Sequence, residues 1–427
     1  MITRRAVLAM SSTASGGLAM LAIAWLAARR LTGPELGFFF SFLSFGALVQ
    51  LGDLGVSYAA LQTAASLAGS GRRAELPGLA RHVARWNLAA ASAVTLLVAG
   101  LGIATFARDA SAVRWLPPWL AYLAAVFVNQ LTIPRMALRE GAGRIAQMWT
   151  LRLVQEWVAG AACLVALHRG GALWSLSAYV AARAAIAVGW LVAAESFGAR
   201  AGDPPFARSR WMAEVWPFQW KIALSGVSGF LIFRAFTPIV LLEKGSVAAG
   251  QFGLAISLMN LLIAITTAWP LSHAARYATL NAGGRSHELE REFPAMLWGS
   301  TAVAVAAMVT LCAVAWQARA MGIAVALRLP EVVTTFLVFA AAVMHHVVAC
   351  FAVFLRARGR EPLLVASVVG SIGTAIAVWL AAHFGSLRAV AGVNLVCAAV
   401  GIPVVLYLFV RRGTMHGNSA QLDAAPR

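Results

Sequence analysis

Six charged side chains lie inside long apolar runs of the chain, and these residues have the types and positions that could do chemistry. A charge at the centre of a bilayer costs about 2.5–3.5 kcal/mol on insertion scales, so each needs a partner or a water-filled cavity. Four of the six are basic and two are acidic, which favours an anionic ligand over a cationic one. They are Asp53, Arg152, Glu156, Arg183, Lys221 and Arg234.

Arg183 is the strongest single candidate for a binding residue. It lies near the middle of its apolar run, and no acidic residue stands three or four positions away. An arginine in that position is expected to face a wet cavity and bind an anion, and its guanidinium matches phosphate oxygens in a bidentate geometry. Arg152 and Glu156 are four residues apart and share a helix face, so they either neutralise each other as an ion pair or line the cavity.

The other three charges each have two interpretations. Lys221 stands near the end of its run, where its side chain either reaches the interface or contacts a substrate. Arg234, just before Pro238, either reaches the interface or lines a cavity beside a distorted helix. Asp53 either pairs with a cavity arginine or takes a coupling proton. Five amides inside the runs are candidates for hydrogen bonds to sugar hydroxyls: Asn129, Gln130, Gln147, Gln155 and Asn260.

Sequence patterns of catalysis and metal binding are missing. There is no P-loop, no HExxH and no G-x-S-x-G, so we expect neither an enzyme nor a cofactor. His345 and His346 are adjacent, which places their side chains about 100° apart on a helix and makes a poor metal site. The four cysteines lie in apolar runs without a CxxC pair and are expected to be small buried side chains.

The composition requires a membrane environment. Apolar residues form 61% of the 427-residue chain and charged residues only 12%, whereas soluble domains carry roughly 25% charged residues. The net charge of +18 comes from basic residues scattered over short loops, which is typical of membrane proteins and unlike a nucleic-acid-binding patch. These features exclude a soluble enzyme, a disordered protein and a secreted disulfide scaffold.

A membrane span needs about 20 apolar residues, and the sequence predicts twelve such spans. If the N-terminus is cytoplasmic, 21 of the 34 basic residues fall in cytoplasmic segments and nine on the opposite side. This asymmetry predicts that both termini are cytoplasmic. The predicted spans are 6–28, 36–58, 86–107, 116–137, 145–167, 172–195, 215–242, 249–272, 294–317, 332–355, 362–384 and 389–410.

An internal repeat divides these spans into two sets of six. The pattern Gly-x-Phe-x-x-x-x-Ser occurs from Gly37 to Ser44 and again from Gly250 to Ser257, at an offset of 213 residues. With an even number of spans, both halves insert the same way up, and a substrate site is expected between them. We therefore predict an all-α polytopic protein of two pseudo-symmetric six-helix lobes, residues 1–205 and 206–427, linked by residues 198–214.

The run from Leu31 to Gln62 and the run from Trp216 to Leu262 resemble the opening helices of Wzx-type O-antigen and polysaccharide flippases. These belong to the multidrug/oligosaccharidyl-lipid/polysaccharide (MOP) exporter superfamily. The resemblance implies a MATE-like fold with a central cavity and a location in the bacterial inner membrane. It also implies export of an undecaprenyl-diphosphate-linked oligosaccharide for surface polysaccharide and lipopolysaccharide synthesis, beside polymerase and chain-length proteins.

Three alternatives stay open beside a lipid-linked oligosaccharide flippase. A cation-coupled multidrug exporter of the same superfamily is expected to present acidic residues in its cavity. A membrane glycosyltransferase, ligase or polymerase would carry a large periplasmic loop, and the longest such loops here have around ten residues. A non-transporting scaffold for envelope assembly is compatible with everything in the sequence.

Overall fold

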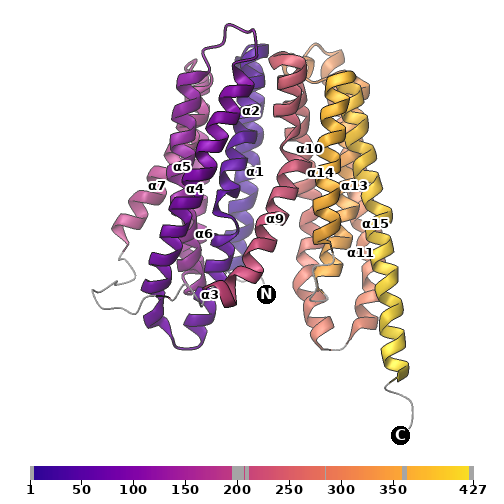
Figure 1. Cartoon of the computed structure of the whole chain (residues 1–427). Helices are drawn as coiled ribbons and strands as arrows, with labels where there is room; N and C mark the ends of the chain where they lie inside the picture. Colours follow the sequence, from indigo (N-terminus) through magenta and orange to yellow (C-terminus); the bar gives the residue numbers. More distant parts are fainter. Residues whose placement is uncertain (1–3, 195–205, 207–210, 284, 358–362, 423–427) are drawn as a thin grey trace. The chain divides into compact units, whose positions relative to one another are not determined.

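The computed structural model describes residues 4–194, 206, 211–283, 285–357 and 363–422, and within them every regular element is a helix (Figure 1). The prediction of an all-α fold is confirmed. Ten segments of the described residues are long and apolar enough to cross a membrane, and two of them, Gly33–Gly69 and Gln219–Asn281, each run through two successive α-helices. The chain is therefore a multi-pass membrane protein.

The chain forms two compact units, and it passes from one to the other within α10 (Phe236–Ala282). Met1–Leu254 forms the first unit and Ala255–Arg427 the second. The first contains α1 (Arg4–Arg30), α2 (Gly33–Gln50), α3 (Val56–Gly69), α4 (Leu76–Phe106), α5 (Leu116–Gly141), α6 (Ile145–His168), α7 (Trp174–Ala193) and α9 (Trp216–Phe233). The second contains α11 (Ser286–Ala320), α12 (Ala324–Leu327), α13 (Val332–Ala357), α14 (Leu364–Phe384) and α15 (Leu387–Leu422).

The predicted second span is a broken helix. α2 ends at Gln50, and the chain turns through Leu54 and Gly55, which both have positive φ, before α3 begins at Val56. Asp53 supplies the cap of α3, because its carboxylate accepts the backbone N–H groups of Gly55 at 2.8 Å and Ser57 at 3.2 Å. A side chain at position 55 would also lie 2.9 Å from a backbone oxygen of α9, so glycine fits there on two grounds.

The predicted seventh span is also interrupted. α9 ends at Phe233, and α10 then changes direction at Gly245, where φ is 81°. The next segment of α10 is capped from a distant loop: Asp109, between α4 and α5, accepts hydrogen bonds from Ser246 N at 2.8 Å and Ser246 Oγ at 3.2 Å. Partial burial raises the pKa of the Asp109 carboxyl, but hydrogen bonds from Ser111 and Ser246 outweigh it and hold the pKa below its usual value.

The equivalent glycines of the sequence repeat meet where α2 crosses α10. A Cβ on Gly250 would lie 2.9 Å from the backbone nitrogen of Gly37, and a Cβ on Gly37 would lie 1.9 Å from the carbonyl oxygen of Ser246. One turn further along, a Cβ on Gly253 would overlap Phe40. The repeated glycines are therefore positions where two backbones approach too closely for a side chain, as at small-residue contacts between membrane helices.

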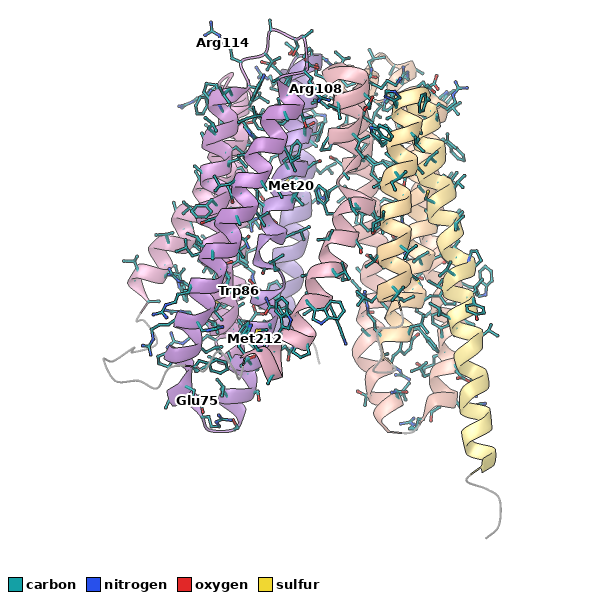
Figure 2. The ribbon with its side chains drawn as sticks, in the orientation of Figure 1. Met20, Glu75, Trp86, Arg108, Arg114 and Met212 are labelled. Atoms are coloured by element: carbon teal, nitrogen blue, oxygen red, sulfur yellow. The ribbon has the colours of Figure 1, made fainter. Side chains whose placement is uncertain are left out.

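Aromatic residues form much of the core of the first unit. Trp119 on α5 is fully buried and packs against Phe42 of α2 and Phe106 of α4, with ring centroids 4.9 and 5.1 Å apart. The loops lie at opposite ends of this unit: Figure 2 shows Arg108 and Arg114 at one end and Glu75 at the other. This arrangement matches helices that run from one membrane surface to the other.

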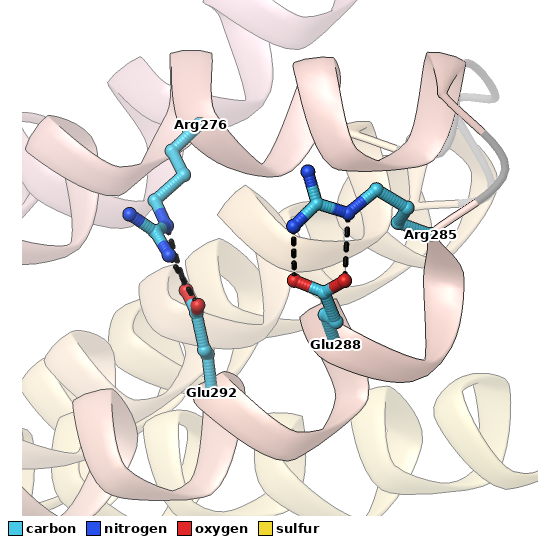
Figure 3. A network of polar contacts seen from close by, with 4 residues as sticks. All are labelled: Arg276, Arg285, Glu288 and Glu292. Atoms are coloured by element: carbon cyan, nitrogen blue, oxygen red, sulfur yellow. Dashed lines mark hydrogen bonds and ion pairs between the residues drawn. The ribbon is translucent and has the colours of Figure 1, made fainter.

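The second unit has its own apolar core and two ion pairs beside one of its turns. Phe293 of α11 and Phe354 of α13 pack at 4.5 Å between centroids within a buried cluster that also includes Tyr277. Two ion pairs hold the turn between α10 and α11: Arg276 Nε donates to Glu292 at 2.8 Å, and Arg285 Nε donates to Glu288 at 2.6 Å (Figure 3).

The division into two six-helix lobes stays a prediction. The predicted linker, residues 198–214, lies mostly outside the described residues.

Candidate functional site

A polar cavity of about 370 Å³ lies inside the first unit, bounded by α1, α5, α6 and α7. Its lining contains three of the six intramembrane charges singled out in the sequence: Arg152, Glu156 and Arg183. Charged and polar groups inside a membrane have a free-energy cost, so their presence around a cavity indicates a role in structure or ligand binding. This cavity is therefore the candidate functional site.

Helical spacing brings the lining residues together. Arg152, Gln155 and Glu156 are three and four residues apart on α6, so they lie on one face of that helix. Asn129, Thr132, Ile133 and Met136 form a similar stripe on α5. Among the residues of α1 whose side chains the structure describes, Gly16 and Gly17 line the cavity, and a Cβ on Gly16 would be in van der Waals contact with the Glu156 carboxylate at 3.5 Å.

Arg183 is held by a carboxylate and a phenol. Its Nη1 donates a short hydrogen bond to Glu156 Oε1 and a second, of 3.2 Å, to the hydroxyl of Tyr179. Tyr179 donates in turn to Glu156 Oε2 at 3.0 Å. The sequence shows no acid three or four positions from Arg183, but Arg183 is nevertheless paired, because its acid comes from the neighbouring helix, where spacing along one helix cannot reveal it.

Arg152 pairs with Glu140 rather than with Glu156. Its Nη2 donates to Glu140 Oε2 at 2.6 Å, and its guanidinium stacks over the ring of Trp149 at 4.6 Å. The pairing of Arg152 with Glu156, one of the two interpretations of their spacing, is therefore wrong. Side chains on a helix point toward its N-terminus, so Arg152 reaches back toward the end of α5, where Glu140 stands.

The cavity is electrically balanced but keeps free donors. Arg183 uses one of its three nitrogens on Glu156 and Tyr179, and Arg152 uses one on Glu140. The remaining N–H groups of both side chains have no partner among the described residues. Arg183 and Arg152 keep 27% and 28% of their side-chain surface exposed, so these donors can reach a ligand.

Amides surround the arginines. Gln155 is buried and donates to the carbonyl of Arg183 at 2.9 Å, which ties α6 to α7. Asn129 lines the cavity, whereas its neighbour Gln130 is fully buried behind it and neither of its amide atoms has a hydrogen-bond partner in the structure. The lining therefore offers both donors and acceptors, which is the pattern that sugar hydroxyls require.

The three remaining charged candidates lie apart from this cavity. Asp53 caps α3, so its predicted pairing with an arginine is wrong. Lys221 lies exposed on α9. Arg234 is exposed at the end of α9, and no carboxylate among the described residues lies within ion-pair distance of it. The structure brings Arg152, Glu156 and Arg183 together and leaves Asp53, Lys221 and Arg234 outside the group.

Neither a family model nor a curated protein matches the sequence. Solved structures do match its fold. An inward-facing multidrug resistance MATE family transporter of the MOP superfamily has a TM-score of 0.67 and 12% identity, covering 98% of this chain and 100% of that one. A MATE protein in the bent conformation has a TM-score of 0.61 and 14% identity, covering 98% and 96%. The lipid II flippase MurJ in an inward closed conformation has a TM-score of 0.70 and 10% identity, covering 94% and 87%.

The chain has the fold of MATE transporters and of MurJ. At these identities the likeness concerns the fold alone, and the MATE-like fold predicted from the sequence is confirmed. The shared fold does not distinguish Wzx-type flippases from other proteins that have it, so the Wzx-type resemblance stays a prediction.

Sequence reasoning missed two partners of the cavity arginines, Tyr179 and Glu140, and the approach of α1 to Glu156 at Gly16. Tyr179 stands four residues before Arg183, so a search for any polar neighbour on the same face, rather than for acids alone, would have found it. Glu140 and Gly16 needed the packing of α5 and α1 against α6, which the sequence pattern does not contain.

Proposed function

We propose that this protein is a membrane transporter that flips an undecaprenyl-diphosphate-linked oligosaccharide across the bacterial inner membrane. The observation that carries the proposal is the polar cavity of the first unit, whose arginines keep free N–H donors beside buried amides. Guanidinium groups suit a diphosphate, and amides suit sugar hydroxyls. The fold supports a transporter, because the solved structures that share it include a lipid II flippase and multidrug transporters.

Membrane lipids, a polysaccharide polymerase and chain-length proteins are the partners that this proposal implies. The cavity residues Arg183 and Arg152 would contact the substrate, and Arg234 and Lys221, which lack a described carboxylate partner, would add positive charge elsewhere along its path. Asp53 and Glu156 are the carboxylates that a coupling proton would use, and Glu156 is the better placed because it lines the cavity.

A cation-coupled multidrug exporter is the second candidate, and one observation favours it. Each cavity arginine is paired with a carboxylate, so the net positive charge that argued for an anionic substrate is absent from this cavity. Glu156, once released from Arg183, would be an acceptor for an organic cation. A role as an envelope-assembly scaffold remains the third proposal.

Lipid analysis of a deletion strain separates these proposals. Undecaprenyl-linked intermediates are extracted, and the membrane side that holds them is determined with an impermeant probe. Flipping predicts complete repeat units accumulated on the cytoplasmic side, restored by the wild-type gene and not by an Arg183→Glu variant that still inserts. Normal surface polysaccharide with altered drug sensitivity would contradict flipping and favour the multidrug exporter.

A further inference from the structure

A second cavity, of about 500 Å³, lies in the second unit and differs in chemistry from the first. It is a groove between the last third of α11 and the start of α13, and Ala326 of α12 also lines it. Val309, Cys312, Trp316 and Phe336 line it, and Arg319 is the only charged residue among its described lining residues. Its volume falls within the roughly 300–1,000 Å³ of small-ligand sites.

The groove has the depth of one membrane leaflet. Its lining on α11 extends from Met308 to Arg319, which is about 16 Å along the helix at 1.5 Å per residue. Half of a hydrocarbon core about 30 Å thick is about 15 Å. Arg319 lies in the last turn of α11, at the end where the chain leaves the apolar span. The deep end of the groove is therefore at acyl-chain depth and its mouth at headgroup depth.

The guanidinium at the mouth is fixed in place and keeps free donors. Nη1 of Arg319 donates to the carbonyl oxygens of Pro330 at 2.9 Å and Leu329 at 3.3 Å. Nε and Nη2 have no partner among the described residues. The nearby acid, Glu331, is held by Arg388 at 2.7 Å and Thr334 at 3.1 Å, and Arg388 lowers the pKa of that carboxyl.

Positive charge dominates around the mouth. Arg319 at the end of α11 and Arg328 in the loop to α13 are both basic, and Arg388 joins them through Glu331, the one acid of that loop. Trp316 beside Arg319 is 61% exposed, in the position that tryptophans favour at a membrane interface. An apolar groove that ends at a fixed cation fits an amphiphile with an apolar chain and an anionic head.

We propose that this groove binds one anionic glycerophospholipid, with an acyl chain along α11 and its phosphate at Arg319. The occupant is a lipid of the bilayer and not the transported substrate, so the inference stands independently of the proposed function. Phosphatidylcholine carries the same phosphate, but its choline cation is repelled by the Arg319 guanidinium, so the groove is expected to prefer a headgroup with a net negative charge.

The test uses native mass spectrometry of the full chain in lipid nanodiscs that contain equal amounts of phosphatidylglycerol and phosphatidylcholine. The wild type is expected to retain a single phosphatidylglycerol. Arg319→Gln is expected to weaken that retention about tenfold, the loss that follows from removing one charge-assisted hydrogen bond. Arg328→Gln removes the same charge from the loop that follows α11, at a residue that does not line the groove, and it is expected to retain the lipid as the wild type does.

Ala313→Phe provides a second variant that leaves the charges intact. Ala313 lines the groove and is exposed, so a phenyl ring there fills the space without disturbing the core. It is expected to abolish retention of the single phosphatidylglycerol. Equal retention of both lipids by the wild type, or unchanged retention by Arg319→Gln, overturns the proposal. Displacement of phosphatidylglycerol by added undecaprenyl phosphate would assign the groove to polyprenyl chains and overturn it as well.

Discussion

At the scale of single residues, the ion pair of Arg183 and Glu156 has two roles that mutation can separate. As a structural contact it joins α6 to α7, and as part of the cavity wall it presents a guanidinium on one particular helix. A structural contact tolerates exchange of the two charges, whereas a ligand site does not, because the cation moves to the other side of the cavity.

Arg183→Glu is expected to abolish transport and to lower stability by about 1–3 kcal/mol, because Glu156 loses a charge-assisted partner and gains a like charge. The double variant Arg183→Glu/Glu156→Arg is expected to regain the stability and not the transport. Thermal unfolding in detergent and the cellular export assay measure the two effects. Transport restored by the exchanged pair would show that the pair is structural only.

The site residues themselves could be predicted to the extent that they are charges inside apolar runs. Arg152, Glu156 and Arg183 are predicted in this way, and Asn129 and Gln155 are predicted as amides inside the same runs. Their partners could not be found, because pairs such as Arg152 with Glu140 join different helices. The spacing of residues in the sequence identifies neighbours three or four positions apart on one helix. It gives no information about which residues meet where two helices pack together.

At the scale of elements, the crossing of α2 and α10 depends on glycines that have no room for a methyl group. Gly37→Ala is expected to destabilise the protein in spite of the higher helix propensity of alanine, because its Cβ would overlap the carbonyl of Ser246. Gly189→Ala on α7, where no atom lies within 4 Å, is the matched control and is expected to be neutral or stabilising by up to about 1 kcal/mol. Unfolding midpoints measured in detergent compare the two, and a neutral Gly37→Ala would contradict this packing.

The cap that Asp109 supplies to α10 gives a pH-dependent contribution to stability. Because folding lowers the pKa of this carboxyl, its contribution is fully present above the unfolded value of about 4 and is lost as the pH falls through the lower folded value. Asp109→Ala is expected to cost about 0.5–2 kcal/mol at pH 7, as loss of a cap does.

Unfolding midpoints of the wild type and of Asp109→Ala between pH 7 and pH 3 measure this contribution. The two proteins are expected to converge toward the acidic end of the range. A difference between them that is the same at every pH would contradict the role of the charged carboxylate.

Helix existence was predictable, but helix breaks were not. The hydrophobic runs located the spans, because about 20 apolar residues leave few other structures in a membrane. The interruptions at Leu54–Gly55 and at Arg234–Ala235 fall inside apolar sequence and depend on tertiary contacts, such as the close approach of α9 to Gly55. The hydrophobic pattern of the sequence continues through both interruptions, so it does not predict them.

At the scale of the whole molecule, the distribution of basic residues predicts which surface faces the cytoplasm. Ala74 and Ala110 are both exposed. Ala74 precedes Glu75 and Ala110 lies between Arg108 and Arg114, and Figure 2 shows these labelled residues at opposite ends of the first unit. With both termini cytoplasmic, an impermeant maleimide applied to intact cells is expected to label Ala110→Cys and not Ala74→Cys. In lysed cells, where the maleimide reaches both membrane surfaces, both cysteine variants are expected to be labelled. The wild-type protein, treated in the same way, measures the background labelling of the native cysteines. Selective labelling of Ala74→Cys would invert the topology.

The contact between Gly37 and Gly250 has a further meaning, because these glycines are the same position of the two sequence repeats. When a residue meets its own counterpart, the contact is isologous, the kind that joins two identical subunits about a twofold axis. At this crossing the chain makes with itself the kind of contact that joins the subunits of a homodimer. Loss of either glycine therefore removes the close approach from both helices at once.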